Sequence, residues 1–473
     1  IRIGHTAKEL GYSTVAVFPE DDVNSLHVKQ SDEAVQIPGA GAQAYLNIEA
    51  IINVAKTCGA DAVHPGYGFL SENPDFAKAC EDADINFVGP TAAQLSIFGN
   101  KAGARTLAAE LEIPLVPGTN EDTSLAAVIN FQDQHPDRGV VIKAISGGGG
   151  RGMRIIEDRN DIEKNFERCK SEANLAFGDD RVYVESLIPR ARHIEVQIVG
   201  DGTGRVTHLW ERDCSTQRQN QKIIEVAPSP NMSDSTRTAL LQASMRMAAH
   251  ASYRGVGTFE FLVNADQSDE FFFIEANARL QVEHTVTEAI TGLDLVALQL
   301  RIAAGETLHE LELLEPPAIA GYAIQCRINM ETPGKKGLFK PTGGTIDIFE
   351  PPSGPGIRVD TFGYAGYKTS TRYDSLLAKL IIHSKSDDFS VCVEKTIRAV
   401  RQFRLEGFNV NLPFLQALVS SQDFQNASIT TRYIDLNLAS LVSEDSSDSP
   451  AKNAGLAGKK LNTKDPLAVL ALG

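Results

Sequence analysis

The stretch Phe273-Ile-Glu-Ala-Asn-Ala-Arg-Leu-Gln-Val-Glu-His284 alternates polar with small or apolar residues. As a β-strand, it would place five polar side chains on one face and the small or apolar ones on the other. The polar positions are Glu275, Asn277, Arg279, Gln281 and Glu283. A solvated edge strand usually explains such alternation, but solvated faces tend to use Lys and Thr. Carboxylates, amides and a guanidinium in series combine cation ligands with anion donors, so the pattern favours a ligand-binding strand.

A second predicted strand, residues 257–263, precedes this stretch, and a polar turn at 264–270 separates the two. In a hairpin, the midpoint between Glu260 and Glu275 falls inside this turn, so the two carboxylates would face each other. Facing like charges repel unless a cation neutralises them, and Mg²⁺ typically takes one or two carboxylates plus substrate phosphates. The register therefore predicts a divalent-metal site, with a shifted hairpin as the alternative.

The glycine run Gly147-Gly-Gly-Gly-Arg-Gly152 lies between two predicted strands, 140–145 and 153–156. Backbone N–H groups in such a hairpin can approach a polyphosphate, and Lys143 on the first strand supplies positive charge. The sequence has no Walker A pattern, so this is a different kind of phosphate loop. A plain flexible loop is the alternative.

A charge-rich run covers residues 211–222 and ends in Lys222. Charged runs usually form solvated surface, and we predict solvated surface here. Lys222 would take part in chemistry only if its ammonium reached an anion.

The chain has 473 residues, enough for roughly three domains. Its 45 Lys and Arg against 61 Asp and Glu give a net charge of −16, which argues against nucleic acid or an anionic membrane as the main partner. The six cysteines form no C-x-x-C pair, which favours a reducing compartment. No apolar run approaches the roughly 18 residues of a membrane span. We expect a cytoplasmic protein, with an organelle matrix as the alternative.

Short β runs alternate with helical patterns over the first hundred residues, which is typical of an α/β domain with a parallel sheet. Segment 1–11 has the pattern of the second half of a helix, so we expect a strand to precede residue 1. Strand patterns dominate residues 320–383 and helical patterns return at Phe389. A Ser- and Asp-rich linker follows residue 438.

Taken together, the motifs resemble those of biotin carboxylase, the ATP-grasp component of biotin-dependent carboxylases. Besides the hairpin and the glycine run, the matching segments are His64-Pro-Gly-Tyr-Gly-Phe-Leu-Ser-Glu-Asn73, Gly89-Pro-Thr91, Arg192-His-Ile-Glu-Val-Gln197, Glu211-Arg-Asp-Cys-Ser215, Cys326-Arg-Ile-Asn329 and Tyr373-Asp-Ser375. They occur in the family's order and cover residues 1 to about 436.

The resemblance implies an ATP-grasp fold that combines α/β and α+β parts. A doubly wound α/β domain at 1–99, lacking its first strand, would precede an ATP-grasp domain at 100–306. A mobile glycine-rich lid would cover about 115–190, and a C-terminal α+β domain would cover 320–436. Residues 437–473 would form a linker towards a missing downstream domain.

The resemblance also implies roles for individual residues. The ATP-binding set would be Lys101, Lys143, Gly148, Gly149, Gly150, Glu185, Ile188, His193, Gln217 and Asn220. Mg²⁺ or Mn²⁺ would be held by Glu260, Glu275 and Asn277, in agreement with the hairpin argument. Bicarbonate would be held by Lys222, Arg279, Gln281 and the Val282 backbone. The catalytic set would be Glu283 as general base and Arg327 as the group that stabilises the biotin enolate, with Arg279 and Lys222.

The implied reaction is carboxylation of biotin with bicarbonate and ATP. Glu283 would take the bicarbonate proton, so that bicarbonate attacks the γ-phosphate and forms carboxyphosphate. Carboxyphosphate would give CO₂ and phosphate, the phosphate would deprotonate biotin, and Arg327 would stabilise the enolate that attacks CO₂. The products are carboxybiotin, ADP and phosphate, and lid closure would keep water from the intermediate.

Three positions depart from the family pattern. Asn220 stands where most members carry His, Gln219 where they carry Arg, and Ser186 where Lys is common. We expect altered nucleotide contacts at Gln219 and Asn220, and little effect at Ser186, where backbone atoms would contact adenine.

The sequence contains no Met-Lys-Met biotinylation motif, so the carrier is expected on another chain or a downstream domain, together with a carboxyltransferase. We expect an acyl-CoA carboxylase, and the resemblance implies a homodimer. Urea or pyruvate carboxylase, and a catalytically silent ATP-binding scaffold, are the alternatives. Another ATP-grasp ligase, such as half of a carbamoyl-phosphate synthase, would not be expected to carry the Arg-Leu-Gln-Val-Glu run.

Overall fold

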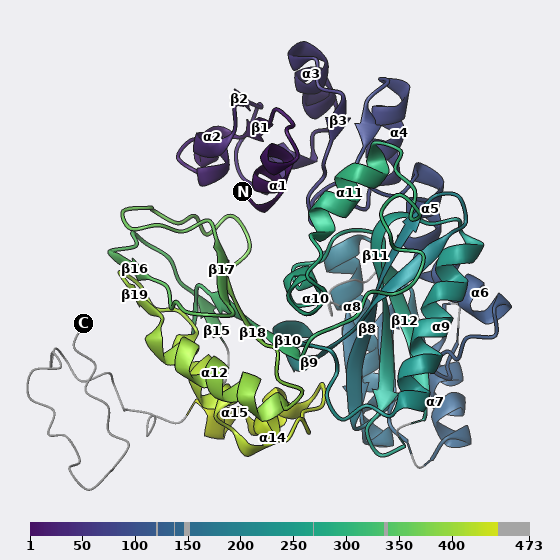
Figure 1. The fold of residues 1–473 in the computed structure, drawn as a ribbon. Helices are drawn as coiled ribbons and strands as arrows, with labels where there is room; N and C mark the ends of the chain where they lie inside the picture. Colours follow the sequence, from purple (N-terminus) through teal and green to yellow (C-terminus); the bar gives the residue numbers. More distant parts are fainter. Residues whose placement is uncertain (120–121, 137, 146–151, 268, 335–338, 443–473) are drawn as a thin grey trace, which may run out of the picture.

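The computed structural model describes residues 1–119, 122–136, 138–145, 152–267, 269–334 and 339–442. An N-terminal α/β part, a small sheet and a long twisted sheet follow one another along the chain (Figure 1). The predicted combination of α/β and α+β architecture is confirmed.

The N-terminal part alternates short strands with helices, as predicted. Its elements are α1 (Arg2–Glu9), β1 (Val15–Phe18), η1 (Glu20–Asp22), α2 (Leu26–Gln30), β2 (Glu33–Gln36), η2 (Ala42–Leu46), α3 (Ile48–Cys58), β3 (Ala62–Val63), α4 (Pro74–Asp82), β4 (Asn86–Phe87) and α5 (Ala92–Phe98). β1 pairs in parallel with β2 and β3 with β4, so the described residues form two small parallel sheets rather than one. Asn47, Asn73 and Thr91 accept bonds from free N–H groups in the first turns of α3, α4 and α5, which explains where these helices begin.

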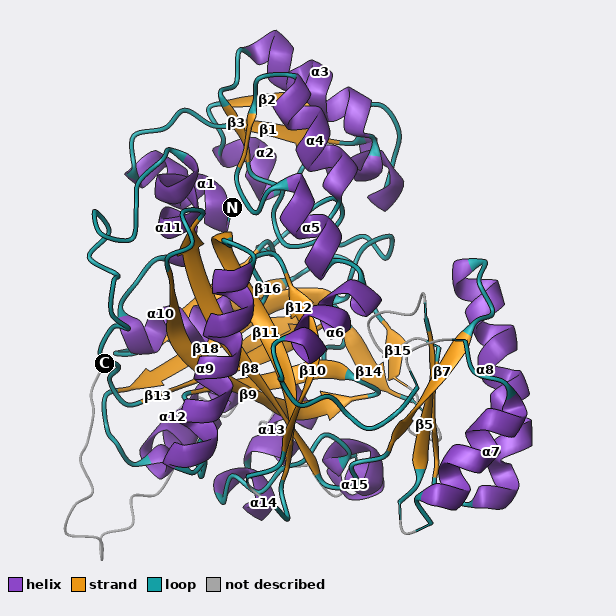
Figure 2. Cartoon of the chain, turned by 90° about the vertical axis from the view of Figure 1, so that its right-hand side faces the viewer, coloured by secondary structure: helices purple, strands orange, loops and turns teal. Residues whose placement is uncertain are grey.

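The predicted lid contains an antiparallel sheet in the order β6-β5-β7. Helix α6 (Lys101–Glu110) precedes the predicted lid. The elements of the lid are α7 (Leu125–Gln134), β5 (Val140–Ala144), β6 (Met153–Ile156), η3 (Arg159–Asp161), α8 (Ile162–Phe177) and β7 (Val182–Ser186). The β5–β6 hairpin is confirmed, with Lys143 opposite Met153. Helices α7 and α8 lie beside this sheet (Figure 2) and bury Val128 and Cys169 against it. The predicted phosphate contacts Gly148, Gly149 and Gly150 lie outside the described residues.

Within the described residues, the central sheet has eight strands in the order β12-β11-β8-β9-β10-β13-β18-β17, all antiparallel. Its strands are β8 (Ala191–Asp201), β9 (Val206–Arg218), β10 (Gln221–Ala227), β11 (Arg254–Asn264), β12 (Phe271–Asn277), β13 (Tyr322–Asn329), β17 (Ile357–Thr361) and β18 (Leu376–Ser384). The helices inserted among them are α9 (Asp234–His250), α10 (His284–Thr291) and α11 (Leu295–Ala303). β10 pairs with β13, so the sheet runs unbroken from the ATP-grasp region into the C-terminal region.

The C-terminal part packs helices on the far end of this sheet. Its remaining elements are β14 (Glu331–Pro333), β15 (Phe339–Pro341), β16 (Ile348–Glu350), α12 (Phe389–Gln402), β19 (Arg404–Glu406), α13 (Leu412–Val419), α14 (Gln422–Gln425) and α15 (Tyr433–Leu441). The predicted change from strands to helices at Phe389 is confirmed. Helix α15 continues past residue 436, where the linker was predicted to follow, and residues 443–473 lie outside the described residues. Among the described helices, none combines the length and apolar character needed to cross a bilayer.

Candidate active site

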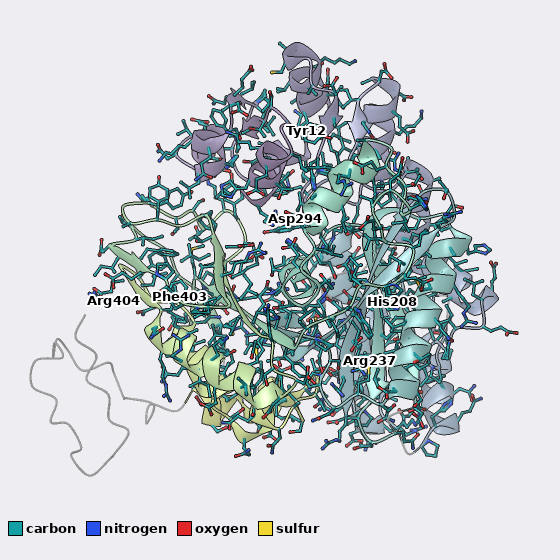
Figure 3. The ribbon with its side chains drawn as sticks, viewed as in Figure 1. Tyr12, His208, Arg237, Asp294, Phe403 and Arg404 are labelled. Atoms are coloured by element: carbon teal, nitrogen blue, oxygen red, sulfur yellow. The ribbon has the colours of Figure 1, made fainter. Side chains whose placement is uncertain are left out.

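The charge-rich run 211–222 lies in the hairpin β9–β10 and is mostly buried outside the exposed residues 219–221 at its turn, so the prediction of a solvated surface is wrong for most of the run. Glu211 and Arg212 are 0% exposed because β9 lies inside the sheet and helices α9 and α10 pack on it. Arg237 of α9, labelled in Figure 3, donates from Nε to Glu211 at 2.9 Å. The hairpin turns at Gln219 and Asn220, which both have positive φ, as two-residue turns of this kind require.

Lys222 on β10 lies among three buried carboxylates. Its Nζ is 2.5 Å from Glu195, 3.0 Å from Glu260 and 2.7 Å from Glu283. Burial alone would lower the pKa of Lys222, but the three carboxylates raise it well above its ordinary value. The ammonium is therefore held in its charged form at the centre of the site.

Glu283 does not lie on a strand, so the predicted strand over 273–283 is wrong in its second half. β12 ends at Asn277, and the chain bends and turns before α10 begins. Glu72 of the N-terminal part contacts this bend, where its carboxylate accepts bonds from the Ala278 N–H and the Arg279 Nε. After the bend, Glu283 contacts Lys222. The bend, and not the alternation of a strand, therefore places this carboxylate in the site.

The Glu283 carboxylate contacts a second cation, Arg327 of β13, whose Nη2 is 3.0 Å away. Burial would raise the pKa of Glu283, but Lys222 and Arg327 together hold it well below the ordinary range for Glu. Arg327 also donates from Nε to Glu225 of β10 at 2.5 Å. Two cations from neighbouring strands therefore keep this carboxylate ionised.

The predicted register of β11–β12 is confirmed, because Glu260 pairs directly with Glu275. Glu260 Oε1 accepts from Asn277 Nδ2 and Gln281 Nε2, each at 2.8 Å. Its Oε2 lies 2.7 Å from His193 Nε2. Burial would raise the pKa of Glu260, but Lys222 and His193 lower it well below the usual range. Two facing carboxylates and an amide supply the oxygen ligands that a hard divalent cation prefers, so these residues fit Mg²⁺.

The remaining predicted bicarbonate residues lie around this cluster. Arg279 donates from Nη2 to Asn277 Oδ1 at 3.0 Å. The Val282 carbonyl accepts a bond from Lys379 Nζ of β18 at 3.1 Å, which ties the bend to the C-terminal part. The structure therefore brings together Lys222 of β10, Arg327 of β13 and, from the segment that follows β12, Gln281 and Glu283, with Arg279 beside Asn277.

The predicted nucleotide residues are more dispersed. Glu185 of β7 is buried and pairs through its side chain with Arg105 of α6, at 2.7 Å, and with Lys143. Ile188 packs in an apolar cluster with Val116 and Phe272. Nothing is described of the Lys101 side chain.

Two other predicted nucleotide residues lie in the hairpin β9–β10, Gln217 on strand β9 and Asn220 in the turn. Gln217 Nε2 is 2.6 Å from His193 Nδ1, which places it beside the metal-type carboxylates. Asn220 lies exposed at the tip of the β9–β10 turn.

Sequence reasoning missed Glu195 and Arg212. His193, Glu195 and Glu260 offer ligand atoms within 4.8 Å of one another. Along β8, His193, Glu195 and Gln197 share one face by strand alternation, and this signal could have identified Glu195. Arg212 gave no local signal, because its partners lie on other elements.

Comparisons with known proteins show which family the chain resembles. Residues 1–95 match the family "Biotin carboxylase, N-terminal domain", residues 100–311 match "Carbamoyl-phosphate synthase L chain, ATP binding domain", and residues 325–436 match "Biotin carboxylase C-terminal domain". The biotin carboxylase domain of the Hydrogenobacter thermophilus 2-oxoglutarate carboxylase, solved as a dimer with MgADP, ADP and bicarbonate, superposes with a TM-score of 0.87 at 38% identity, covering 93% of this chain and 95% of that one. The chain belongs to the biotin carboxylase family.

Longer carboxylases also match this biotin carboxylase chain. Staphylococcus aureus pyruvate carboxylase is 43% identical over 442 residues, covering 92% of this chain and 38% of that protein. A single-chain, multi-domain long-chain acyl-CoA carboxylase superposes with a TM-score of 0.82 at 40% identity, covering 93% of this chain and 42% of that one. The chain thus spans about two fifths of the length of the curated relatives it matches.

Proposed function

We propose that the protein carboxylates biotin with bicarbonate and ATP, giving carboxybiotin, ADP and phosphate. The observation that carries this proposal is the pairing of Glu283 with both Lys222 and Arg327, at 2.7 and 3.0 Å. Lys222 also contacts the Glu260 carboxylate, at 3.0 Å. A buried base between two cations suits a reaction in which one anion is deprotonated and a second anion develops.

The two cations also control the strength of the base. In the free protein they lower the pKa of Glu283, so its carboxylate is a weak proton acceptor. Bicarbonate bound by Lys222, Arg279, Gln281 and the Val282 backbone would draw Lys222 away from Glu283. Biotin would likewise engage Arg327. Each loss of positive charge raises the basicity of Glu283 at the moment its substrate is present.

The hairpin β11–β12 would hold the divalent ion through Glu260, Glu275 and Asn277. Bound Mg²⁺ or Mn²⁺ would neutralise negative charge on the ATP phosphates. Lys101 and Lys143 would contact the same phosphates, and Gly148, Gly149 and Gly150 would cover them. Glu185 and Ile188 would frame the adenine, with His193, Gln217 and Asn220 nearer the ribose or phosphates.

The biotin would come from a carrier domain that works with a carboxyltransferase, and the acceptor would be chosen there. The curated relatives are pyruvate carboxylases, which favours pyruvate as acceptor over the acyl-CoA that the sequence suggested. The acyl-CoA carboxylase among the solved neighbours supports the second candidate. The dimeric neighbour supports a homodimer.

The proposal is tested by supplying ATP, Mg²⁺, isotopically labelled bicarbonate and free biotin, and measuring labelled carboxybiotin. Glu283→Gln should lower this rate by about 10²-fold or more while ATP binding persists. Glu270→Gln, in the turn between β11 and β12, is the control and should retain the wild-type rate. ATP binding without label transfer in the wild type would instead support a silent nucleotide-binding scaffold.

A further inference from the structure

Arg212 of β9 is 0% exposed and contacts two residues that border the candidate bicarbonate site, Glu195 and Gln281. A guanidinium has five N–H donors, and here five acceptors surround it. The contacts are Nε to Glu195 Oε1 at 2.5 Å, Nη1 to Gln197 Oε1 at 2.7 Å and Thr287 Oγ1 at 2.9 Å, and Nη2 to Thr258 Oγ1 at 3.1 Å and Gln281 Oε1 at 2.8 Å. With every donor used, the group has one orientation.

This orientation fixes the amide of Gln281. Its oxygen accepts from Arg212, so its nitrogen is turned to the opposite side, where it donates to Glu260 Oε1 at 2.8 Å. An amide without such partners can flip and present oxygen instead of N–H. An oxygen in that place would repel an anion. Arg212 thereby keeps the amide nitrogen of Gln281, rather than its oxygen, turned towards Glu260 and the candidate site.

Arg212 also acts on Lys222 through Glu195. The two oxygens of the Glu195 carboxylate are divided between Arg212, at 2.5 Å, and Lys222 Nζ, at 2.5 Å. Glu195 is 0% exposed, so water does not compete for either oxygen. The position of the ammonium beside Glu283 therefore depends on a carboxylate that Arg212 anchors.

We propose that Arg212 is a positioning residue for the bicarbonate site, which sets the direction of the Gln281 amide and, through Glu195, the place of the Lys222 ammonium. Its five donors are all used within the protein and it is fully buried, so it would act on the anion through other residues and not by contact. The proposal rests on the proposed function, because the anion it serves is the bicarbonate of that reaction. If Arg212 served folding alone, replacing it would not change the KM for bicarbonate more than the KM for ATP.

The test is steady-state kinetics of Arg212→Lys, with bicarbonate and ATP varied separately. A lysine can pair with Glu195 but cannot reach Gln281 at the same time. The KM for bicarbonate should rise by about tenfold or more, while the KM for ATP stays within about twofold. Arg218→Lys changes a second buried guanidinium of β9, which pairs with Glu331 and, within the described part of the chain, contacts no residue of the candidate bicarbonate site, so it is the control and should leave both KM values near wild type.

If Arg212→Lys does not fold, Glu195→Asp replaces it, because the shorter carboxylate cannot bridge Arg212 and Lys222. The same selective rise in the KM for bicarbonate is expected. An unchanged KM for bicarbonate in whichever variant folds, or an equal rise in both KM values, would overturn the proposal while wild-type turnover left the proposed function standing. Absence of bicarbonate-dependent turnover in the wild type would overturn both.

Discussion

Two antiparallel hairpins carry the charges of the site, and they differ in their place in the sheet. Hairpin β9–β10 lies in the middle, while β11–β12 forms one end. The charged side chains of β9–β10 pair with partners that are far away in the sequence and are either oppositely charged or neutral. Arg218, for example, pairs with Glu331. In β11–β12, two like charges, Glu260 and Glu275, are paired across the strands. The central hairpin therefore holds charges that the protein itself neutralises, whereas the end hairpin carries the pair of like charges on which the proposed cation site rests.

The largest expected effect concerns Lys222 in the central hairpin. Lys222→Met would leave Glu195, Glu260 and Glu283 without their shared ammonium. Removing one partner from a buried ion cluster should lower the free energy of unfolding by about 3–5 kcal/mol. Urea denaturation followed by circular dichroism measures this loss. A stability equal to that of wild type would remove the structural role given to the cluster.

Arg218 should show a similar but smaller effect at the end of β9. Arg218 makes two bonds of 2.8 Å to Glu331, and both side chains are under 10% exposed. Arg218→Met should cost about 3 kcal/mol of unfolding free energy, because Glu331 is left buried and unpaired.

The matched control is Arg432, whose partner Glu157 is 62% exposed. Arg432→Met should cost less than about 1 kcal/mol, as is usual for a surface pair. Equal losses in the two variants would contradict the distinction between buried and exposed charges.

In the end hairpin, Glu275→Gln should change metal dependence more than stability. The Mg²⁺ concentration for half-maximal ADP release should rise by about tenfold, because a charged oxygen ligand is replaced by a neutral one. Asp266→Asn in the turn of the same hairpin removes an exposed charge paired with Arg190 and should leave Mg²⁺ dependence unchanged. If Glu275→Gln instead lowered the free energy of unfolding by several kcal/mol, Glu275 would stabilise the fold, and this contrast between the two hairpins would be contradicted.

The smallest effect is the pH dependence of stability. The pKa values of Glu260 and Glu283 are lowered in the folded protein, so their stabilisation is present above the unfolded pKa and is lost as pH falls. With an unfolded pKa of about 4.3, each group should cost about 0.5 kcal/mol between pH 5 and pH 4. Glu283→Gln should show a correspondingly shallower decline in urea denaturation over this range, and an unchanged slope would contradict the assigned pairing.

Local pattern predicted the end hairpin and failed for the central one, for a physical reason. The register of β11–β12 follows from alternation and a polar turn, both contained within residues 257–283. The burial of 211–222 depends on acceptors far along the chain, such as Gln281 for Arg212. Likewise, the chain directly after the end of β12 at Asn277 is bonded to Glu72, a residue of another part of the fold. No pattern inside the stretch itself encodes these partners.

The most direct measurement is ADP release by the purified protein with Mg²⁺ and ATP, adding bicarbonate and free biotin separately and together. Our account predicts turnover that requires bicarbonate and rises with biotin, because each substrate that engages one of the two cations makes Glu283 a stronger base. Turnover that is independent of bicarbonate, or that is unchanged in Glu283→Gln, would contradict the assignment of this site to biotin carboxylation.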